Sequence, residues 1–135
     1  MLDRQDLMAM SESDYMNDEQ LKFFTNILTV QKEELLKALE TARLELTESD
    51  ISADPNDVAS SQEIQQLKLS TANAQNAMLK DINKALDRIN NDEYGYCEVS
   101  GEPIGIERLL AKPTATLSIY EREAKEHRER TQGKL

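Results

Sequence analysis

The chain has 135 residues, of which 26 are acidic and 16 are basic, so its formal net charge is −10. Aromatic residues make up only 4% and tryptophan is absent, which argues against a large compact core. The acidic balance argues against direct DNA or RNA binding, because phosphate contacts require clustered lysine and arginine. No stretch is apolar enough to span a membrane, and residues 1–16 lack the pattern of a secretory signal. A cytoplasmic location is therefore expected.

The first long helix is predicted to follow a short N-terminal segment, residues 1–16, that packs on its base. Asn17 is predicted to be the N-cap, and Gln20 three positions later completes a capping-box pattern. The helix is expected to continue to about Ser49, because apolar residues recur at helical spacing. These residues are Leu21, Phe24, Leu28, Leu35, Ala38, Leu39, Ala42 and Leu46.

A second long helix is predicted from about Asp57 to Asn91. Its apolar stripe advances by three or four residues without a break and is interpreted as the seam of a coiled coil. The stripe consists of Ile64, Leu67, Thr71, Ala74, Met78, Ile82, Ala85 and Ile89. Two helices of this length with a short connection must fold back as an antiparallel hairpin. Residues 17–92 are therefore predicted to form a rod with its tip at residues 50–59.

The segment of residues 93–117 is predicted to be a small, loop-rich head, because most of the glycines and prolines of the chain are gathered there. Its expected core is Tyr94, Tyr96, Val99, Ile104, Ile106, Leu109 and Leu117. Residues 118–135 follow, with a charged helix expected from Ser118 to about Arg130. The overall expectation is a mainly α fold.

The tip is acidic, and residues 44–67 contain no lysine or arginine. Asp54, Pro55 and Asp57 have a structural explanation as the N-cap, first residue and first-turn acid of a helix. A functional role for Asp54 and Asp57 is compatible with this structural explanation, because a capped helix start holds carboxylates rigidly. An exposed tip offers no cleft that would perturb a pKa, so any chemistry there is expected inside a partner.

The single cysteine, Cys97, is interpreted as a small buried hydrophobe, with a reactive thiol as the alternative.

Two motifs together identify a family resemblance that covers the chain from about Tyr15. The first is D-P-x-D-x-A at Asp54–Ala59, between the two helical arms. The second is D-E-Y-G-Y-C-E-x-x-G-x-x-I-G-I-x-R-L-x-A-x-P-T-A-x-L, which begins at Asp92. Both resemble the DksA/TraR family of bacterial transcription factors. The resemblance implies a zinc-finger-like head and a non-enzymatic regulator that binds RNA polymerase as a monomer.

The resemblance also implies a mechanism. Family members insert the coiled coil into the secondary channel of RNA polymerase, change the lifetime of promoter open complexes, and amplify the response to the alarmone guanosine tetraphosphate (the stringent response). The resemblance assigns Asp54, Asp57 and Ala59 to the tip that acts near the polymerase active centre. Lys112 and Arg122 match basic positions of the alarmone site. Asp81 stands where a lysine is expected, which predicts a weaker or altered response.

The zinc ligands of the family are not reproduced. The four positions of its two C-x-x-C pairs are occupied by Cys97, Ser100, Ser118 and Glu121. A structural zinc site requires four cysteine or histidine ligands, so no zinc is predicted. Two other functions remain open. One is a Gre-type transcript-cleavage factor whose acidic tip assists a catalytic metal ion, and the other is a coiled-coil adaptor with no polymerase role.

Overall fold

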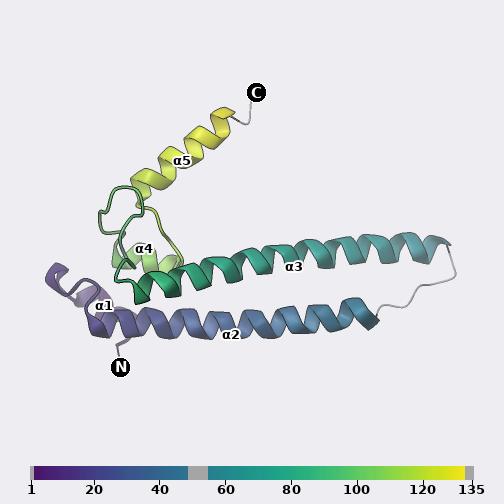
Figure 1. The fold of residues 1–135 in the computed structure, drawn as a ribbon, viewed down its shortest axis with the longest axis horizontal. Coiled ribbons are helices and arrows are strands. Elements are labelled where there is room, and N and C mark those ends of the chain that lie inside the picture. Colours follow the sequence, from purple (N-terminus) through teal and green to yellow (C-terminus); the bar gives the residue numbers. More distant parts are fainter. Residues whose placement is uncertain (1, 49–54, 133–135) are drawn as a thin grey trace. The chain divides into compact units, whose positions relative to one another are not determined.

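The computed structural model describes residues 2–48 and 55–132, and for residues 46–48 and 55–59 it describes the backbone alone. Five α-helices and one 3-10 helix form the described chain (Figure 1): α1 (Arg4–Ala9), η1 (Glu12–Asp14), α2 (Asp18–Glu48), α3 (Pro55–Asn90), α4 (Ile106–Ala111) and α5 (Ile119–Gln132). The only β pairing in these ranges is an isolated bridge between Tyr96 and Pro103. The predicted mainly α fold, with two long helices and a C-terminal helix, is confirmed. No helix in the described ranges is long and apolar enough to cross a membrane.

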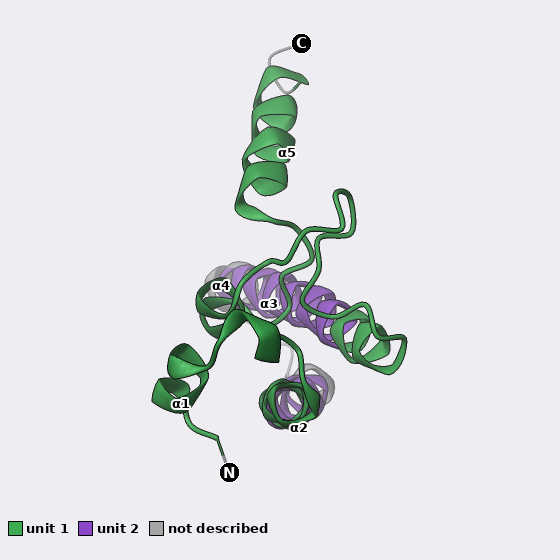
Figure 2. Ribbon diagram, turned by 90° about the vertical axis from the view of Figure 1, so that its left-hand side faces the viewer, with its two compact units in different colours: residues 1–28, 83–135 green, residues 29–82 purple. Residues whose placement is uncertain are grey.

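The chain divides into two compact units (Figure 2). The first unit contains residues 1–28 and 83–135, and the second contains residues 29–82, the remaining lengths of α2 and α3. The first unit holds most of the core. Its fully or almost fully buried apolar side chains are Leu7, Phe24, Leu28, Ala85, Tyr94, Cys97, Ile104, Leu109 and Ala115.

The start of α2 is fixed by a cap close to the predicted one. The side chain of Asn17 accepts a hydrogen bond from the backbone N–H of Gln20 at 2.9 Å, as expected for an N-cap. The amide oxygen of Gln20 returns to the backbone N–H of Met16 at 2.8 Å rather than to that of Asn17. The reciprocal bond therefore reaches one residue further back, because the N–H of Asn17 is already bonded to the carbonyl of Asp14.

The predicted seam of the second arm is wrong over most of its length. Ile82 and Ala85 are buried, but Ile64, Leu67 and Met78 are exposed, Leu67 to 69%. Thr71 and Ala74 are exposed as well. The positions of α3 that are buried or half-buried are Ser61, Gln65, Lys68, Ala72, Gln75, Leu79, Ile82, Asn83, Ala85, Leu86, Arg88 and Ile89.

The reason for this difference is an offset between two heptad patterns. From Ser61 to Leu79 the inward positions alternate steps of four and three residues, the heptad spacing that a coiled coil imposes. Ile64, Thr71 and Met78 also recur every seven residues, but each lies three positions after an inward residue. The four-residue step from Met78 to Ile82 then brings the stripe onto the inward positions. The stripe is therefore buried at Ile82 and exposed from Ile64 to Met78.

The core of the head agrees with the sequence prediction in part. Tyr94, Ile104 and Leu109 are buried, while Tyr96, Ile106 and Leu117 are half-buried. Val99 is 65% exposed, so its assignment to the core is wrong. Val99 lies in the turn between Glu98 and Gly101, where the backbone N–H of Gly101 bonds to the carbonyl of Cys97. A turn this tight points its central side chains to solvent.

Gly95 joins the N-terminal segment to the head. Its carbonyl accepts a hydrogen bond from the Tyr15 hydroxyl at 2.6 Å and another from the backbone N–H of Ile104 at 2.8 Å. Its φ is +90°, and an added Cβ would lie 2.7 Å from Cγ of Met16. Both the backbone conformation and the close approach therefore require glycine.

We expect Gly95→Ala to lower the free energy of unfolding by about 2–3 kcal/mol, because it combines a disfavoured φ with a clash. Gly101→Ala is the matched control: its φ is also positive, at +75°, but no atom lies within 4 Å of the added Cβ. The control should cost only about 1 kcal/mol. Denaturant unfolding of both variants measures the difference, and equal losses would show that the Met16 contact is unimportant.

Candidate functional site

The predicted tip lies largely outside the described residues. Helix α3 begins at Pro55, in agreement with the expected first helical residue. Asp54 lies outside the described ranges. Asp57 and Ala59 belong to the first turns of α3, but their side chains are not described. The assignment of these three residues to an active tip therefore remains a prediction.

Three of the four positions that match the zinc ligands of the family are brought together in the head. Cys97 is 3% exposed and Ser118 is 9% exposed. The thiol receives hydrogen bonds from the Ser100 hydroxyl and from the backbone N–H groups of Val99, Ser100 and Ser118. The fourth position, Glu121, directs its backbone N–H to the Ser118 hydroxyl at 3.3 Å, as part of the start of α5.

These donors change the chemistry of Cys97. Burial alone would raise the pKa of the thiol, but the four hydrogen bonds favour the thiolate and lower the pKa to about 6. A lowered pKa of this thiol was not predicted from the sequence, because no histidine or lysine lies beside Cys97 in the chain. The informative signal was the serine three residues later, which places a hydroxyl beside the sulfur.

The residues at these positions do not fit a structural zinc ion. One thiol, two hydroxyls and one carboxylate replace the four thiolates or imidazoles that such a site uses. The Ser118 hydroxyl is also occupied by the helix start of α5. In the described part of the chain, no three histidine, cysteine or acidic side chains are grouped closely enough to hold a metal ion.

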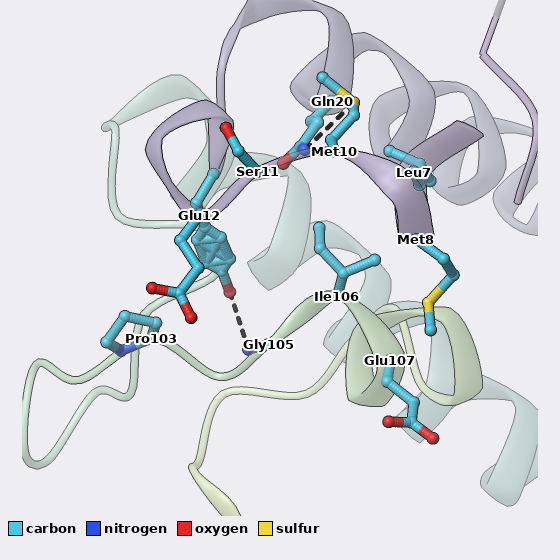
Figure 3. A pocket seen from close by; sticks show the side chains of 11 residues that line it. Leu7, Met8, Met10, Ser11, Glu12, Gln20, Pro103, Gly105, Ile106 and Glu107 are labelled. Atoms are coloured by element: carbon cyan, nitrogen blue, oxygen red, sulfur yellow. Dashed lines mark hydrogen bonds between the residues drawn. The ribbon is translucent and has the colours of Figure 1, made fainter. Parts of the chain in front are cut away.

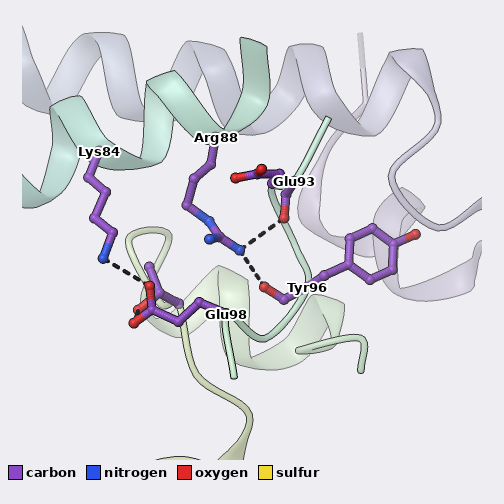
Figure 4. Close-up of polar contacts among 6 residues, drawn as sticks. Lys84, Arg88, Glu93, Tyr96 and Glu98 are labelled. Atoms are coloured by element: carbon purple, nitrogen blue, oxygen red, sulfur yellow. Dashed lines mark hydrogen bonds and ion pairs between the residues drawn. The ribbon is translucent and has the colours of Figure 1, made fainter. Parts of the chain in front are cut away.

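Hydrogen bonds to α3 hold the head in shape (Figure 4). Arg88 donates through Nη2 to the backbone carbonyls of Glu93, at 3.0 Å, and Tyr96. Lys84 forms an ion pair with Glu98 at 2.9 Å. This ion pair, with a further bond from Thr116, outweighs partial burial and lowers the pKa of Glu98. These polar contacts therefore connect the loop of the head to α3 without a metal ion.

The predicted alarmone residues are distributed over both units. Lys112 and Arg122 belong to the first unit, and Asp81 belongs to the second. Lys112 and Asp81 are exposed, and Arg122 is half-buried. Sequence reasoning missed Arg108, whose pKa is lowered by burial and by the nearby positive charge of Arg122.

Arg108 and Arg122 differ in how well they are paired. Arg108 donates to the carbonyl of Leu117 at 3.1 Å. The buried Nε of Arg122 has no hydrogen-bond partner among the described residues, since Glu126 is 3.8 Å away. Two neighbouring guanidinium groups with an unused donor favour an anion.

The structure thus defines a class: an α-helical hairpin with a small head in which backbone and serine donors converge on one thiol. Two family models match the sequence of this chain. Residues 20–89 match the model described as DnaK suppressor protein DksA, N-terminal domain. Residues 92–127 match the model described as prokaryotic dksA/traR C4-type zinc finger. The chain belongs to the DksA/TraR family.

Individual relatives agree with this assignment. The RNA polymerase-binding transcription factor DksA of Caulobacter vibrioides is 40% identical over 131 residues, covering 96% of this chain and 92% of the relative. The protein of the same name from Escherichia coli K12 is 34% identical over 107 residues, covering 78% and 71%. The structure of transcription factor DksA2 from Pseudomonas aeruginosa superposes with a TM-score of 0.84 at 38% identity, covering 95% and 99%.

The lowered pKa of Cys97 predicts a pH-dependent stability. Because the pKa of the folded state, about 6, lies below the ordinary value of 9.0, folding favours the thiolate. The resulting stabilisation is complete above about pH 9 and is lost as the pH falls through 6. We expect Ser100→Ala to raise the pKa of the thiol by about one pH unit, measured from the ultraviolet absorbance of the thiolate.

Cys97 is the only cysteine, so below about pH 9, where tyrosine stays protonated, this absorbance has a single source. Ser70→Ala, at an exposed position on α3, is the control and should leave the titration unchanged. A wild-type midpoint near the ordinary value of a free thiol would contradict the proposed hydrogen bonding of the sulfur.

Proposed function

We propose that this chain is a non-enzymatic transcription regulator that binds RNA polymerase, inserts its helical hairpin into the secondary channel, and modulates promoter open complexes. The observation that carries the proposal is the likeness, over nearly the whole chain, to proteins named RNA polymerase-binding transcription factor DksA. The D-P-x-D-x-A sequence between the arms supports the role of the tip. The protein acts in the cytoplasm, where its polymerase works.

The exposed stripe of α3 supports binding along the arm. Ile64, Leu67 and Met78 are exposed apolar side chains on one face of the second unit. Apolar side chains aligned on a helix are a common basis for docking against another protein. We propose that this stripe supplies affinity for polymerase, while the tip supplies regulation.

The tip would act by charge. Asp57 follows Pro55 in the first turn of α3, and such an end adds little contact area. A carboxylate held there can influence a charged centre within a partner, because the interaction of charges strengthens where water is excluded. The proposal therefore assigns Asp54, Asp57 and Ala59 to the effect on promoter complexes rather than to attachment.

This division predicts two opposite kinds of variant. Asp54→Asn and Asp57→Asn should retain binding to polymerase and melting temperature, since asparagine caps a helix about as well as aspartate, yet lose most regulation. Leu67→Ser should fold normally and weaken binding by roughly fivefold, because a large exposed apolar contact is removed. Competition binding and transcription from a ribosomal RNA promoter measure the two effects.

Glu63→Gln is the matched control, because it removes a charge from the same arm outside the tip motif. Normal regulation by the double Asp54/Asp57 variant would contradict the role of the tip. Cleavage of backtracked RNA by the wild type, lost in that variant, would instead indicate a Gre-type factor. Failure to bind polymerase at all would favour the adaptor.

The head is proposed to fold without zinc, because its donor set does not fit the ion and polar bonds already close the head. A strong chelator should therefore leave the melting temperature unchanged, and purified protein should contain no stoichiometric zinc after dialysis. The matched comparison restores the ligands by Ser100→Cys, Ser118→Cys and Glu121→Cys together, which should create a chelator-sensitive melting temperature. Chelator-induced unfolding of the wild type would contradict the proposal.

Guanosine tetraphosphate is proposed as an effector, held against polymerase with the help of Lys112 and Arg122. The pair of Arg108 and Arg122, with its unused donor, supports a phosphate contact. Asp81 is unfavourable, because a carboxylate near a pyrophosphate repels it. The response is therefore expected to be weaker than in a relative with lysine at this position.

Lys112→Ala and Arg122→Ala should each weaken the affinity for the alarmone about tenfold or more, and Asp81→Lys should increase the response, in accordance with charge-assisted contacts worth about 1.5–3 kcal/mol. Transcription with and without the alarmone gives the measurement. Asp87→Lys makes the same charge reversal on another exposed turn of α3 and should have little effect. Equal responses of Asp81→Lys and wild type would show that Asp81 is not part of the site.

A further inference from the structure

A cavity of about 520 Å³ lies within the first unit, between the N-terminal segment and the start of α4. Its volume is within the range of ligand-binding pockets. Figure 3 shows Ser11 and Glu12 on one side of it and Leu7 and Met8 on the other, with Ile106 between them. The wall is mostly apolar, and Leu7 is 1% exposed.

One polar group in this wall has an unused donor. Gln20 is 1% exposed and lines the cavity. Its amide oxygen accepts from the N–H of Met16, and its amide nitrogen donates to the sulfur of Met10 at 3.4 Å. A thioether is a weak acceptor, and an amide nitrogen carries two protons. Within the described chain the second proton has no partner, which is costly for a buried donor.

The hydroxyls of the wall are already paired: that of Ser11 bonds to Ser13 and Asp14. The Tyr15 hydroxyl donates to the carbonyl of Gly95 and accepts from the N–H of Gly105 at 2.9 Å (Figure 3). The Tyr15 hydroxyl therefore has no free proton to donate to a ligand. Gln20 remains the inner hydrogen-bonding group.

The charged residues that line the cavity have one sign. Glu12 and Glu107 are both exposed lining residues, and they stand apart on different sides in Figure 3. None of the lining residues is lysine or arginine. An anion is therefore repelled, and a cation beside an apolar group is favoured.

We infer that this cavity binds a segment of a partner protein in which an apolar residue adjoins a lysine or arginine. The apolar side chain enters among Leu7, Met8 and Ile106. A backbone carbonyl of the segment accepts the free proton of Gln20, and the basic side chain pairs with Glu12 or Glu107. A peptide supplies all three features at once, whereas a simple amine lacks the acceptor. A second copy of this chain is disfavoured by the net charge of −10.

The experiment follows amide NMR shifts of the full chain during titration with acetyl-Leu-Lys-amide. Acetyl-Leu-Glu-amide tests the charge, acetyl-Ala-Lys-amide tests the apolar side chain, and n-hexylamine tests the carbonyl. We expect shifts centred on the cavity residues, with the Leu-Lys peptide binding about three- to fivefold more tightly than each of the other three probes.

Variants locate the site. Removing both carboxylates, with Glu12→Gln and Glu107→Gln, should reduce affinity for the Leu-Lys peptide about three- to fivefold. Glu102→Gln, an exposed acid of the head that does not line the cavity, should leave affinity unchanged.

Several results would overturn the inference. They are the absence of shifts at millimolar peptide, equal binding of the Leu-Glu peptide, or shifts located away from the cavity. Binding of n-hexylamine as tight as that of the peptide would show that a small amine is the ligand. A concentration-dependent dimer that shifts the same residues without peptide would show that a second copy occupies the cavity.

Discussion

The packing of Tyr94 is the interaction on which the first unit depends. Its ring lies 5.6 Å from that of Phe24, which is completely buried in α2, and its hydroxyl donates to the carbonyl of Pro113 at 2.7 Å. Burial raises the pKa of this hydroxyl, so it remains a donor at every physiological pH. One side chain thus connects a long helix to the loop before α5, and the other head contacts are arranged around it.

The head shows how a finger fold can persist without the ligands of its family. Arg88 and Lys84 fix the loop to α3 through backbone carbonyls and Glu98, and Tyr15 fixes it to the N-terminal segment. The N–H groups that surround Cys97 favour a negatively charged sulfur. The same backbone that can orient thiolates around a metal is therefore suited to stabilise a single thiolate.

The two units carry different kinds of surface. The second unit exposes a line of apolar side chains on α3 and has a partly polar interior, in which the buried amide oxygen of Gln75 lacks a partner in the described chain. The first unit has a well-packed core, an apolar cavity with acidic residues beside it, and neighbouring arginines at α4 and α5. Binding surfaces are thus present on both units, and each is open to a separate test.

The sequence by itself determined the two long helices, the cap at Asn17, the loop-rich head and the family, because these depend on local periodicity, turn residues and motifs. It did not determine which face of α3 is buried, because two sets of positions on α3 keep the heptad spacing, and the more apolar set is the exposed one. Only the tertiary structure decided four features: the exposure of Val99, the donors around Cys97, the proximity of Arg108 to Arg122, and the cavity beside Gln20. Each of these depends on residues distant in the chain or on the path of a loop, and a local sequence pattern encodes neither of those two things.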